Sequence, residues 1–502
     1  MTSGNFWDSD VWSFILILGT IGLTVLVAEA LRNNVKWLKR SLIPSSVLGG
    51  MILLIISTIV FYATGGKDGG KYLFELPCFN GGTMSGMTIL EILTYHCLGL
   101  GFVATALRPG NKKLTKQRAG EVFDSGVTTV SGYLLQGILG LVITIVAVLI
   151  GTQIWEGAGV LLPFGYGQGT GQAMNYGSMY GNSEMPWGFE SVESGRSFGL
   201  AVAAMGFLSA CIGGVIYMNI MRRKGKIVIK DEQKENITLD QIIGPNDTPM
   251  SGSVDKLTIQ VGIVVAVYAV SYCLMEGICS LLNLGESMRA TIFGFNFLIG
   301  TFLAIALKSI ITGLNRKGRI KRQFLNGFMM NRISGFVFDF MVVAGIAAIR
   351  IDAISEYIGT LLIMGVIGAL ATYFYVKFIC EKLFKDYAPQ QFLAFYGMLT
   401  GTASTGIILL REIDDQFETP AADNLVYQNL PAIVFGFPLM LLGTFVYTGS
   451  GKITSPLSVY ITLGLMVVFF VILQIILFRR KIFRKKSVGN AETATKAQTP
   501  SE

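Results

Sequence analysis

Apolar segments long enough to cross a lipid bilayer recur along most of the chain, and no other feature constrains the fold as strongly. An α-helix of ~20 apolar residues spans the hydrocarbon core, because lipid offers no hydrogen-bond partner to backbone outside a helix or a closed barrel. Charged residues make up 14% of the chain, whereas soluble domains contain about 25%. We therefore predict an all-α polytopic membrane protein, embedded in a lipid bilayer. Its eleven expected spans are 11–30, 42–62, 86–107, 125–150, 196–220, 257–282, 290–313, 325–350, 355–378, 425–448 and 455–478.

Basic residues gather in every second loop between these spans. The loops rich in Lys and Arg are 31–40, 108–122, 221–256, 314–322 and the segment after residue 378, and the tail begins with Arg479 and Arg480. Because such loops stay on the cytoplasmic side, we expect the N-terminus outside and the C-terminus in the cytoplasm. Topology thus accounts for the formal net charge of +8, and we expect no nucleic-acid partner.

Two further apolar segments are too short and too rich in glycine to be full spans. Residues 154–181 contain LLPFGYGQGTGQAMNYG, and residues 389–411 contain FLAFYGMLTGTASTGIILL. Each fits a re-entrant hairpin, the first entering from outside and the second from the cytoplasm. Irregular backbone at membrane depth is tolerated only where it is buried in protein or lines a water-filled cavity.

The two halves of the chain repeat one another in outline. In each half, five spans are accompanied by a hairpin before the fifth, and at the two tips Gly169 and Thr170 align with Gly401 and Thr402. The second half starts from the opposite side of the membrane, so we predict two inverted five-helix repeats. The expected parts are the first repeat at 1–220, a cytoplasmic linker at 221–256, the second repeat at 257–450, and an extra helix with a basic cytoplasmic tail at 451–502.

The hairpin tips are the candidate binding sites, because inverted repeats with broken helices place a site near the bilayer midplane. At each tip, one half-helix ends in free carbonyl groups, which can hold a small cation, and the next begins with free N–H groups, which can hold a carboxylate. Tight packing of small residues and structural capping are the alternatives at these positions. The candidate substrate-binding residues are Gly165, Gly167, Gln168, Gly169, Thr170, Gly401, Thr402, Ser404 and Thr405.

Two ionisable residues are further candidates for the substrate site. Asp339 lies near the middle of the eighth span, and an ionisable residue at membrane depth is costly unless it has a function or a polar partner. Arg411 ends the second hairpin. It can meet an anionic substrate or mark the cytoplasmic mouth of the protein.

Enzyme chemistry is not indicated. The six cysteines form no CxxC pair and His96 is the single histidine, so neither a zinc site nor a redox site is expected. No nucleophile has a base at a useful spacing, and GYGQGTG lacks the βαβ surroundings of a nucleotide-binding loop. We expect no catalytic residues and no cofactor other than a coupling ion.

Three strings carry a resemblance to a known family. The chain reads GYGQGTGQA at 165–173, GTASTGI at 401–407 and IPSSVLGG at 43–50. These strings resemble the bacterial sodium/glutamate symporter family, also called the glutamate:sodium symporter (ESS) family. Gln168 and Ser404 depart from its pattern, which often has histidine and proline at these places.

The resemblance implies sodium-coupled uptake of L-glutamate or a similar acidic amino acid. It also implies a homodimer in the bacterial plasma (inner) membrane and an elevator-like mechanism, in which a transport domain moves. On this resemblance, Thr170 and Ser404 are candidate sodium ligands, and Asp339 is a third candidate because of its depth in the eighth span.

Two other functions stay open. The 2-hydroxycarboxylate carriers also use paired glycine-rich re-entrant loops, so citrate and malate are alternative solutes. An ion channel is a third possibility, since re-entrant loops also build selectivity filters. Two unlike tips that enter from opposite faces of one chain favour a carrier with alternating access.

Overall fold

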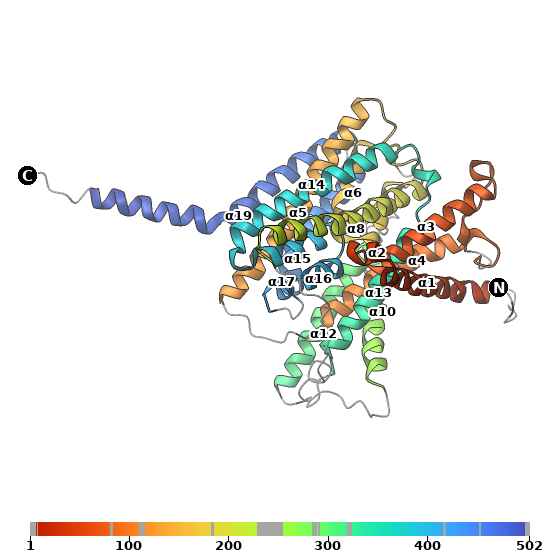
Figure 1. Ribbon diagram of the computed structural model, residues 1–502, viewed down its shortest axis with the longest axis horizontal. Helices are drawn as coiled ribbons and strands as arrows, with labels where there is room; N and C mark the ends of the chain where they lie inside the picture. The colour runs from red at the N-terminus through yellow and green to blue at the C-terminus, as the bar shows by residue number, and fades with distance from the viewer. Residues whose placement is uncertain are drawn as a thin grey trace, which may run out of the picture.

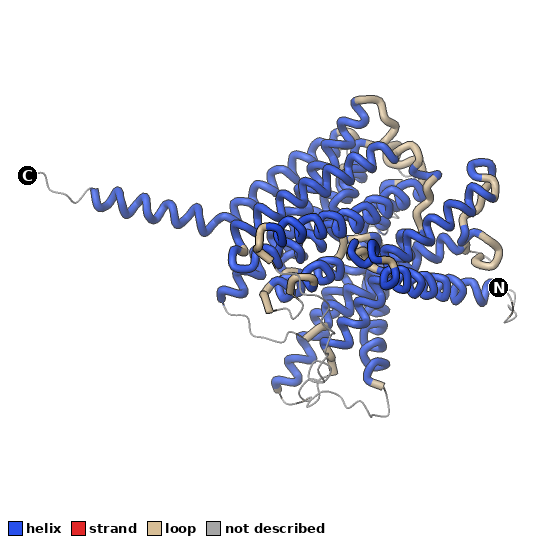
Figure 2. The backbone as a smooth tube through the Cα atoms, in the orientation of Figure 1, coloured by secondary structure: helices blue, strands red, loops and turns tan. Residues whose placement is uncertain are grey.

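The computed structural model describes residues 9–80, 84–109, 116–181, 185–227, 255–283, 292–317, 324–414, 418–450 and 453–496, together with residues 7, 289 and 319 (Figure 1). Within these ranges the regular secondary structure is helical and contains no β-strand (Figure 2). Most of the predicted linker at 221–256 lies outside the described residues. The predicted all-α class is therefore confirmed for the described part of the chain.

Eleven of the described helices are long and apolar enough to cross a membrane, as predicted. They are α1 (Ser9–Asn34), α3 (Ser45–Ala63), α4 (Gly86–Leu107), α5 (Lys116–Leu149), α8 (Val192–Arg223), α10 (Lys256–Leu281), α12 (Asn296–Arg316), α13 (Gly327–Ala347), α14 (Ile358–Leu383), α18 (Asn429–Thr448) and α19 (Leu457–Lys496). The shorter helices are α2 (Lys36–Ser41), α6 (Leu161–Gln168), α7 (Thr170–Tyr180), α15 (Ala388–Thr400), α16 (Ala403–Arg411) and α17 (Ala421–Tyr427).

Helix α5 begins nine residues before the predicted span at 125–150, at Lys116. Hydropathy does not mark these first turns, because they carry charged side chains. Arg118 forms an ion pair with Glu121 one turn later, a spacing that places two side chains on one face of a helix. The Asp124 carboxylate receives a hydrogen bond of 2.7 Å from Arg479 of α19. These polar contacts allow the helix to continue beyond its apolar part.

The predicted span at 425–448 is divided by a turn at Gln428, which separates α17 from α18. Pro431 lies in the first turn of α18, where its missing N–H removes no helical hydrogen bond. The ring of Pro431 packs against Gly126 of α5, and a methyl group at Gly126 would lie 2.5 Å from its Cγ atom. The two residues therefore fix the start of α18 against α5.

The helices pack as two groups. Helices α1, α3, α4, α10, α12 and α13 pack chiefly against one another, and we call them the first helix group. Helices α5 to α8 and α14 to α19 form the second helix group, which occupies the other side of the molecule in Figure 1. Helices α7 and α8 of the second group make the main contacts with α4 and α13 of the first. Each half of the chain contributes three long helices to the first group.

Candidate functional site

The first glycine-rich segment forms two short helices with a break at Gly169. Helix α6 ends at Gln168 and α7 begins at Thr170. Gly169 between them has a φ of 83°, a left-handed conformation that side chains with a Cβ rarely adopt. Glycine at this position therefore allows the chain to turn between the two helices.

The second segment also forms two short helices, α15 and α16, with a break at Gly401 and Thr402. The hydroxyl of Thr402 caps α16, because it accepts a hydrogen bond of 3.4 Å from the N–H of Thr405. Thr405 is buried, Thr402 and Ser404 are half-buried, and Ala403 is exposed. The second break is thus more open than the first, where residues 161–174 are buried except for the half-buried Gln168.

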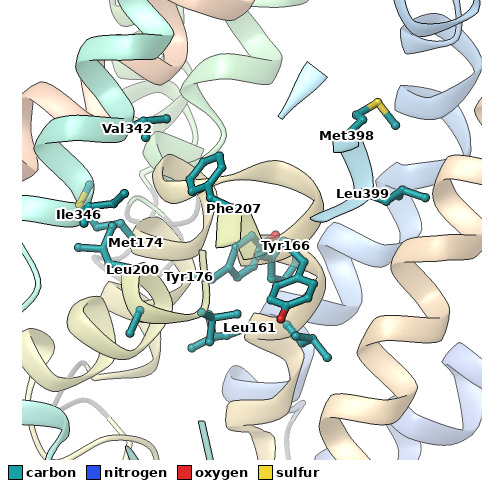
Figure 3. Close-up of a cluster of buried hydrophobic side chains, with 14 of the residues drawn as sticks. Leu161, Tyr166, Met174, Tyr176, Leu200, Phe207, Val342, Ile346, Met398 and Leu399 are labelled. Atoms are coloured by element: carbon teal, nitrogen blue, oxygen red, sulfur yellow. The ribbon is translucent and has the colours of Figure 1, made fainter. Parts of the chain in front are cut away.

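The two breaks lie next to each other although they come from different halves of the chain. A methyl group at Gly169 would lie 3.5 Å from Cγ2 of Thr402 and 3.8 Å from Cε of Met341 on α13. Figure 3 shows the α6–α7 segment with Tyr166 and Tyr176 at its centre, between Ile346 of α13 on one side and Leu399 of α15 on the other. The two predicted tips therefore meet beside one cluster of buried apolar side chains.

Helix α5 contacts both breaks. The hydroxyl of Tyr133 donates a hydrogen bond of 3.0 Å to the carbonyl of Gly167 near the end of α6. The Nε2 of Gln136 donates one of 2.8 Å to the carbonyl of Leu399 near the end of α15 and one of 2.9 Å to the hydroxyl of Thr372. The last carbonyl groups of a helix have no partner within it, so each bond satisfies a group that the break leaves free.

Gly165 and Gly167 make close packing possible in this structure. A methyl group at Gly167 would lie 2.0 Å from Cε1 of Tyr133, and one at Gly165 would lie 2.6 Å from Cγ1 of Val202. Such separations are too short for carbon atoms, so any larger residue would displace the neighbouring side chain or backbone. These contacts favour the packing alternative for the two glycines.

Thr170 begins α7 and is fully buried. Its hydroxyl donates a hydrogen bond of 3.4 Å to the carbonyl of Met341, which attaches α7 to the first helix group. The first backbone hydrogen bond of α7 runs from Ala173 to Gly169 at 3.2 Å. The N–H groups of the first turn of α7 therefore have no hydrogen-bond acceptor within the helix.

Asp339 and Arg411 lie on helices that adjoin the breaks rather than in the breaks themselves. The side chain of Asp339 is exposed on α13 and interacts with the hydroxyl of Ser46, whereas Met341 is the α13 residue that lies beside Gly169. Arg411 is exposed at the last residue of α16. At 1.5 Å per residue, it lies about 12 Å along the axis from the start of that helix.

The polar groups around the breaks are hydroxyl, amide and carbonyl groups. Among the residues that the structure describes, no group of three or more His, Cys, Asp or Glu side chains is arranged to hold a metal ion. A cation at the breaks would therefore meet neutral oxygen atoms, such as the carbonyls at the ends of α6 and α15.

Sequence reasoning missed Tyr133 and Gln136 as residues of the site. Gln136 was detectable in principle, because it is a lone amide in the middle of an apolar span and is fully buried. Tyr133 resembles many other aromatic residues of the spans and carries no comparable signal. In comparisons with known proteins, no protein-family model and no curated protein matches this chain.

Proposed function

We propose that the protein is a secondary transporter that couples the uptake of a small carboxylate, first of all L-glutamate, to sodium. The observation that carries this proposal is the meeting of two helix breaks, at Gly169 and at Gly401–Thr402, inside a bundle with eleven helices able to cross a membrane. Each break separates two consecutive short helices. Interrupted helices that meet inside a transporter form its substrate and ion sites.

The electrostatics of the two breaks suit a cation and an anion together. Helices α6 and α15 end at the breaks with carbonyl groups and partial negative charge. Helices α7 and α16 begin there with N–H groups and partial positive charge. A sodium ion and a carboxylate can therefore occupy the same small region, and each lowers the electrostatic cost of binding the other.

The division into two helix groups supports an elevator-like mechanism on inverted repeats. Both breaks belong to the second helix group, and each half of the chain contributes its first three long helices to the first group. Small residues lie at the contact between the groups: a methyl group at Gly345 of α13 would lie 2.7 Å from Cβ of Thr170. In this proposal the two hairpins are re-entrant and move with the second helix group past the first.

The remaining features of the proposal come from the charge pattern and the family resemblance. In this proposal the C-terminus lies in the cytoplasm and the N-terminus outside, because basic loops favour the cytoplasmic side. The resemblance suggests a homodimer in the bacterial inner membrane. Asp339 stays a candidate for an ion site, although its side chain here is exposed and interacts with Ser46.

The test is uptake of radiolabelled L-glutamate into proteoliposomes that contain the purified protein. An inward sodium gradient is applied in one set of vesicles and replaced by choline in the other. We expect saturable accumulation that requires sodium. Single-channel currents without saturation would instead indicate a pore.

A matched control separates the site from general damage to the protein. Thr405→Val removes a buried hydroxyl at the second break, whereas Thr462→Val removes a buried hydroxyl that donates to the carbonyl of Ser458 within α19. We expect loss of uptake for the first variant alone. If wild-type protein of proven fold accumulates no glutamate with or without sodium, the glutamate assignment is wrong, and citrate and malate are tested next in the same vesicles.

A further inference from the structure

Gln172 lies in the first turn of α7, three residues after the break at Gly169. It is fully buried, and neither its Nε2 nor its Oε1 has a hydrogen-bond partner among the described residues. A buried amide that makes no hydrogen bond is costly, so such groups in folded proteins are normally satisfied. Both polar atoms of the Gln172 amide therefore lack a hydrogen-bond partner within the described part of the protein.

From its position in the first turn of α7, a glutamine side chain can reach back to the break. In an α-helix the Cα–Cβ bond tilts toward the N-terminus, and a long side chain covers the turn that precedes its own Cα atom. For Gln172 the preceding turn is the break itself, with Gln168 and Gly169. The first-turn N–H groups of α7 point in the same direction.

A structural role as a helix cap does not account for this amide. A glutamine at the third position of a helix often reaches back to the N–H of the residue that precedes the helix, which is Gly169 here. In this structure α7 has no side-chain cap, and Gln172 Oε1 accepts no such bond. The amide is thus available to a molecule that enters the break.

We infer that the Gln172 amide binds the solute directly and selects a carboxylate that carries a hydrogen-bond donor on the adjacent carbon. Nε2 and the first-turn N–H groups of α7 donate to the carboxylate, and Oε1 accepts from the donor. Both amide atoms are bonded to one carbon, so the two groups they meet on the solute must be neighbours. The solute class is that of 2-amino and 2-hydroxy carboxylates. This inference rests on the proposed transport function and specifies its substrate.

The experiment compares wild-type protein with Gln172→Met, which keeps the length of the side chain and removes both polar atoms. Binding is measured as the rise in Tm of the purified protein with L-glutamate, with 2-hydroxyglutarate and with glutarate, which lacks the donor. Uptake of L-glutamate into proteoliposomes gives KM. We expect glutarate to bind the wild-type protein more weakly than the other two, and the variant to lose this preference. The variant should raise KM about 10- to 100-fold, as expected for loss of hydrogen bonds to a charged group.

The control is Ser125→Ala on α5. The hydroxyl of Ser125 is also buried without a hydrogen-bond partner in the described part of the chain, and it lies two turns before Tyr133. Both variants should unfold at or above the wild-type Tm without solute, because each removes an unsatisfied polar group. Only the Gln172 variant should lose binding.

The outcomes separate this inference from the proposed function. A Gln172→Met protein with wild-type KM and wild-type preference for 2-substituted solutes overturns the inference and leaves sodium-coupled transport intact. A wild-type protein that neither of the two 2-substituted solutes stabilises also overturns it. If L-glutamate stabilises the wild-type protein but not the variant, and is not accumulated, the inference holds and the proposed transport is wrong.

Discussion

Tyr133 and Gln136 lie on adjacent positions of one face of α5, and each donates a hydrogen bond to the end of a different interrupted helix. Tyr133 bonds to the carbonyl of Gly167 at 3.0 Å, and Gln136 bonds to that of Leu399 at 2.8 Å. Side chains three residues apart in a helix point in similar directions. One turn of α5 therefore donates a hydrogen bond to a carbonyl group at each break.

Replacing Gln136 by leucine should destabilise the second break. The carbonyl of Leu399 and the hydroxyl of Thr372 would lose their donor inside the protein, at a cost of about 1–3 kcal/mol in the free energy of unfolding. We expect a lower Tm and loss of uptake in proteoliposomes.

A comparison with Gln474→Leu tests whether this effect is specific to the break. Nε2 of Gln474 on α19 donates to the hydroxyl of Tyr375 at 2.9 Å, and neither residue belongs to a break. This variant should lower Tm while the KM for the solute stays unchanged. Equal loss of uptake in the two variants would show that Gln136 has no special role.

Replacing Gly169 by alanine should impair transport through backbone strain. A residue with a Cβ at the φ of 83° and ψ of −173° found here costs about 1–3 kcal/mol, and the new methyl group would lie 3.5 Å from Thr402. We expect a reduced maximal rate of uptake, because relief of the backbone strain would alter the geometry of the break between α6 and α7.

Gly225→Ala is the matched variant for Gly169→Ala. Gly225 has a φ of 66° just after α8, and a methyl group there would contact nothing within 4 Å. This variant also introduces a Cβ at a positive φ, but the position is remote from the breaks. A maximal rate of uptake that falls equally in both variants would contradict a direct role of Gly169.

Glu91→Gln should change the relative position of the two helix groups. Glu91 of α4 is buried and forms an ion pair with Arg196 of α8, so this pair joins the first group to the second. The Arg196 side chain is 31% exposed. Loss of the pair should therefore lower the free energy of unfolding by about 1–2 kcal/mol, less than for a fully buried pair. We expect the conformation described here to become less populated.

Spin labels on the two groups can measure this change. Ile59 on α3 and Phe374 on α14 are exposed and accept labelled cysteines, after the exposed Cys78 and Cys273 are replaced by serine. The distribution of distances should broaden or shift in Glu91→Gln. The exposed pair of Glu276 and Arg289 serves as control, and Glu276→Gln should leave the distribution unchanged.

Arg479→Gln should weaken the attachment of α19 to α5. Arg479 donates to Asp124 at 2.7 Å, and its guanidinium lies 5.1 Å from the ring centre of Phe123. We expect a loss of about 1–2 kcal/mol, measured as a lower Tm. Arg480→Gln changes the net charge by the same amount at the next residue, so an equal fall in Tm there would mean that charge alone is responsible.

The eleven spans could be predicted from the sequence because hydropathy is a local property. The positions of the two breaks could also be predicted, since glycine-rich strings such as GYGQGTG interrupt an apolar segment at a definite place. The start of α5 at Lys116 was missed because charged first turns do not differ in hydropathy from a loop.

The partners of the breaks could not be predicted. The bond from Gln136 to Leu399 joins residues 263 positions apart, and that from Tyr133 to Gly167 joins residues 34 positions apart. No periodicity in a single sequence records such a pairing. Asp339 illustrates the same limit, because its depth in a span follows from hydropathy but the face on which its side chain lies depends on how α13 packs.

The contacts of α5 also restrict how the length of the chain can change. A helix turns by about 100° per residue. One residue inserted between Tyr133 and Gln136 would therefore swing one donor away from its carbonyl, whereas an insertion at either end of α5 would leave both donors in phase. Whether both hydrogen bonds form therefore depends on the rotational positions of Tyr133 and Gln136 around α5, rather than on the identity of the surrounding apolar residues.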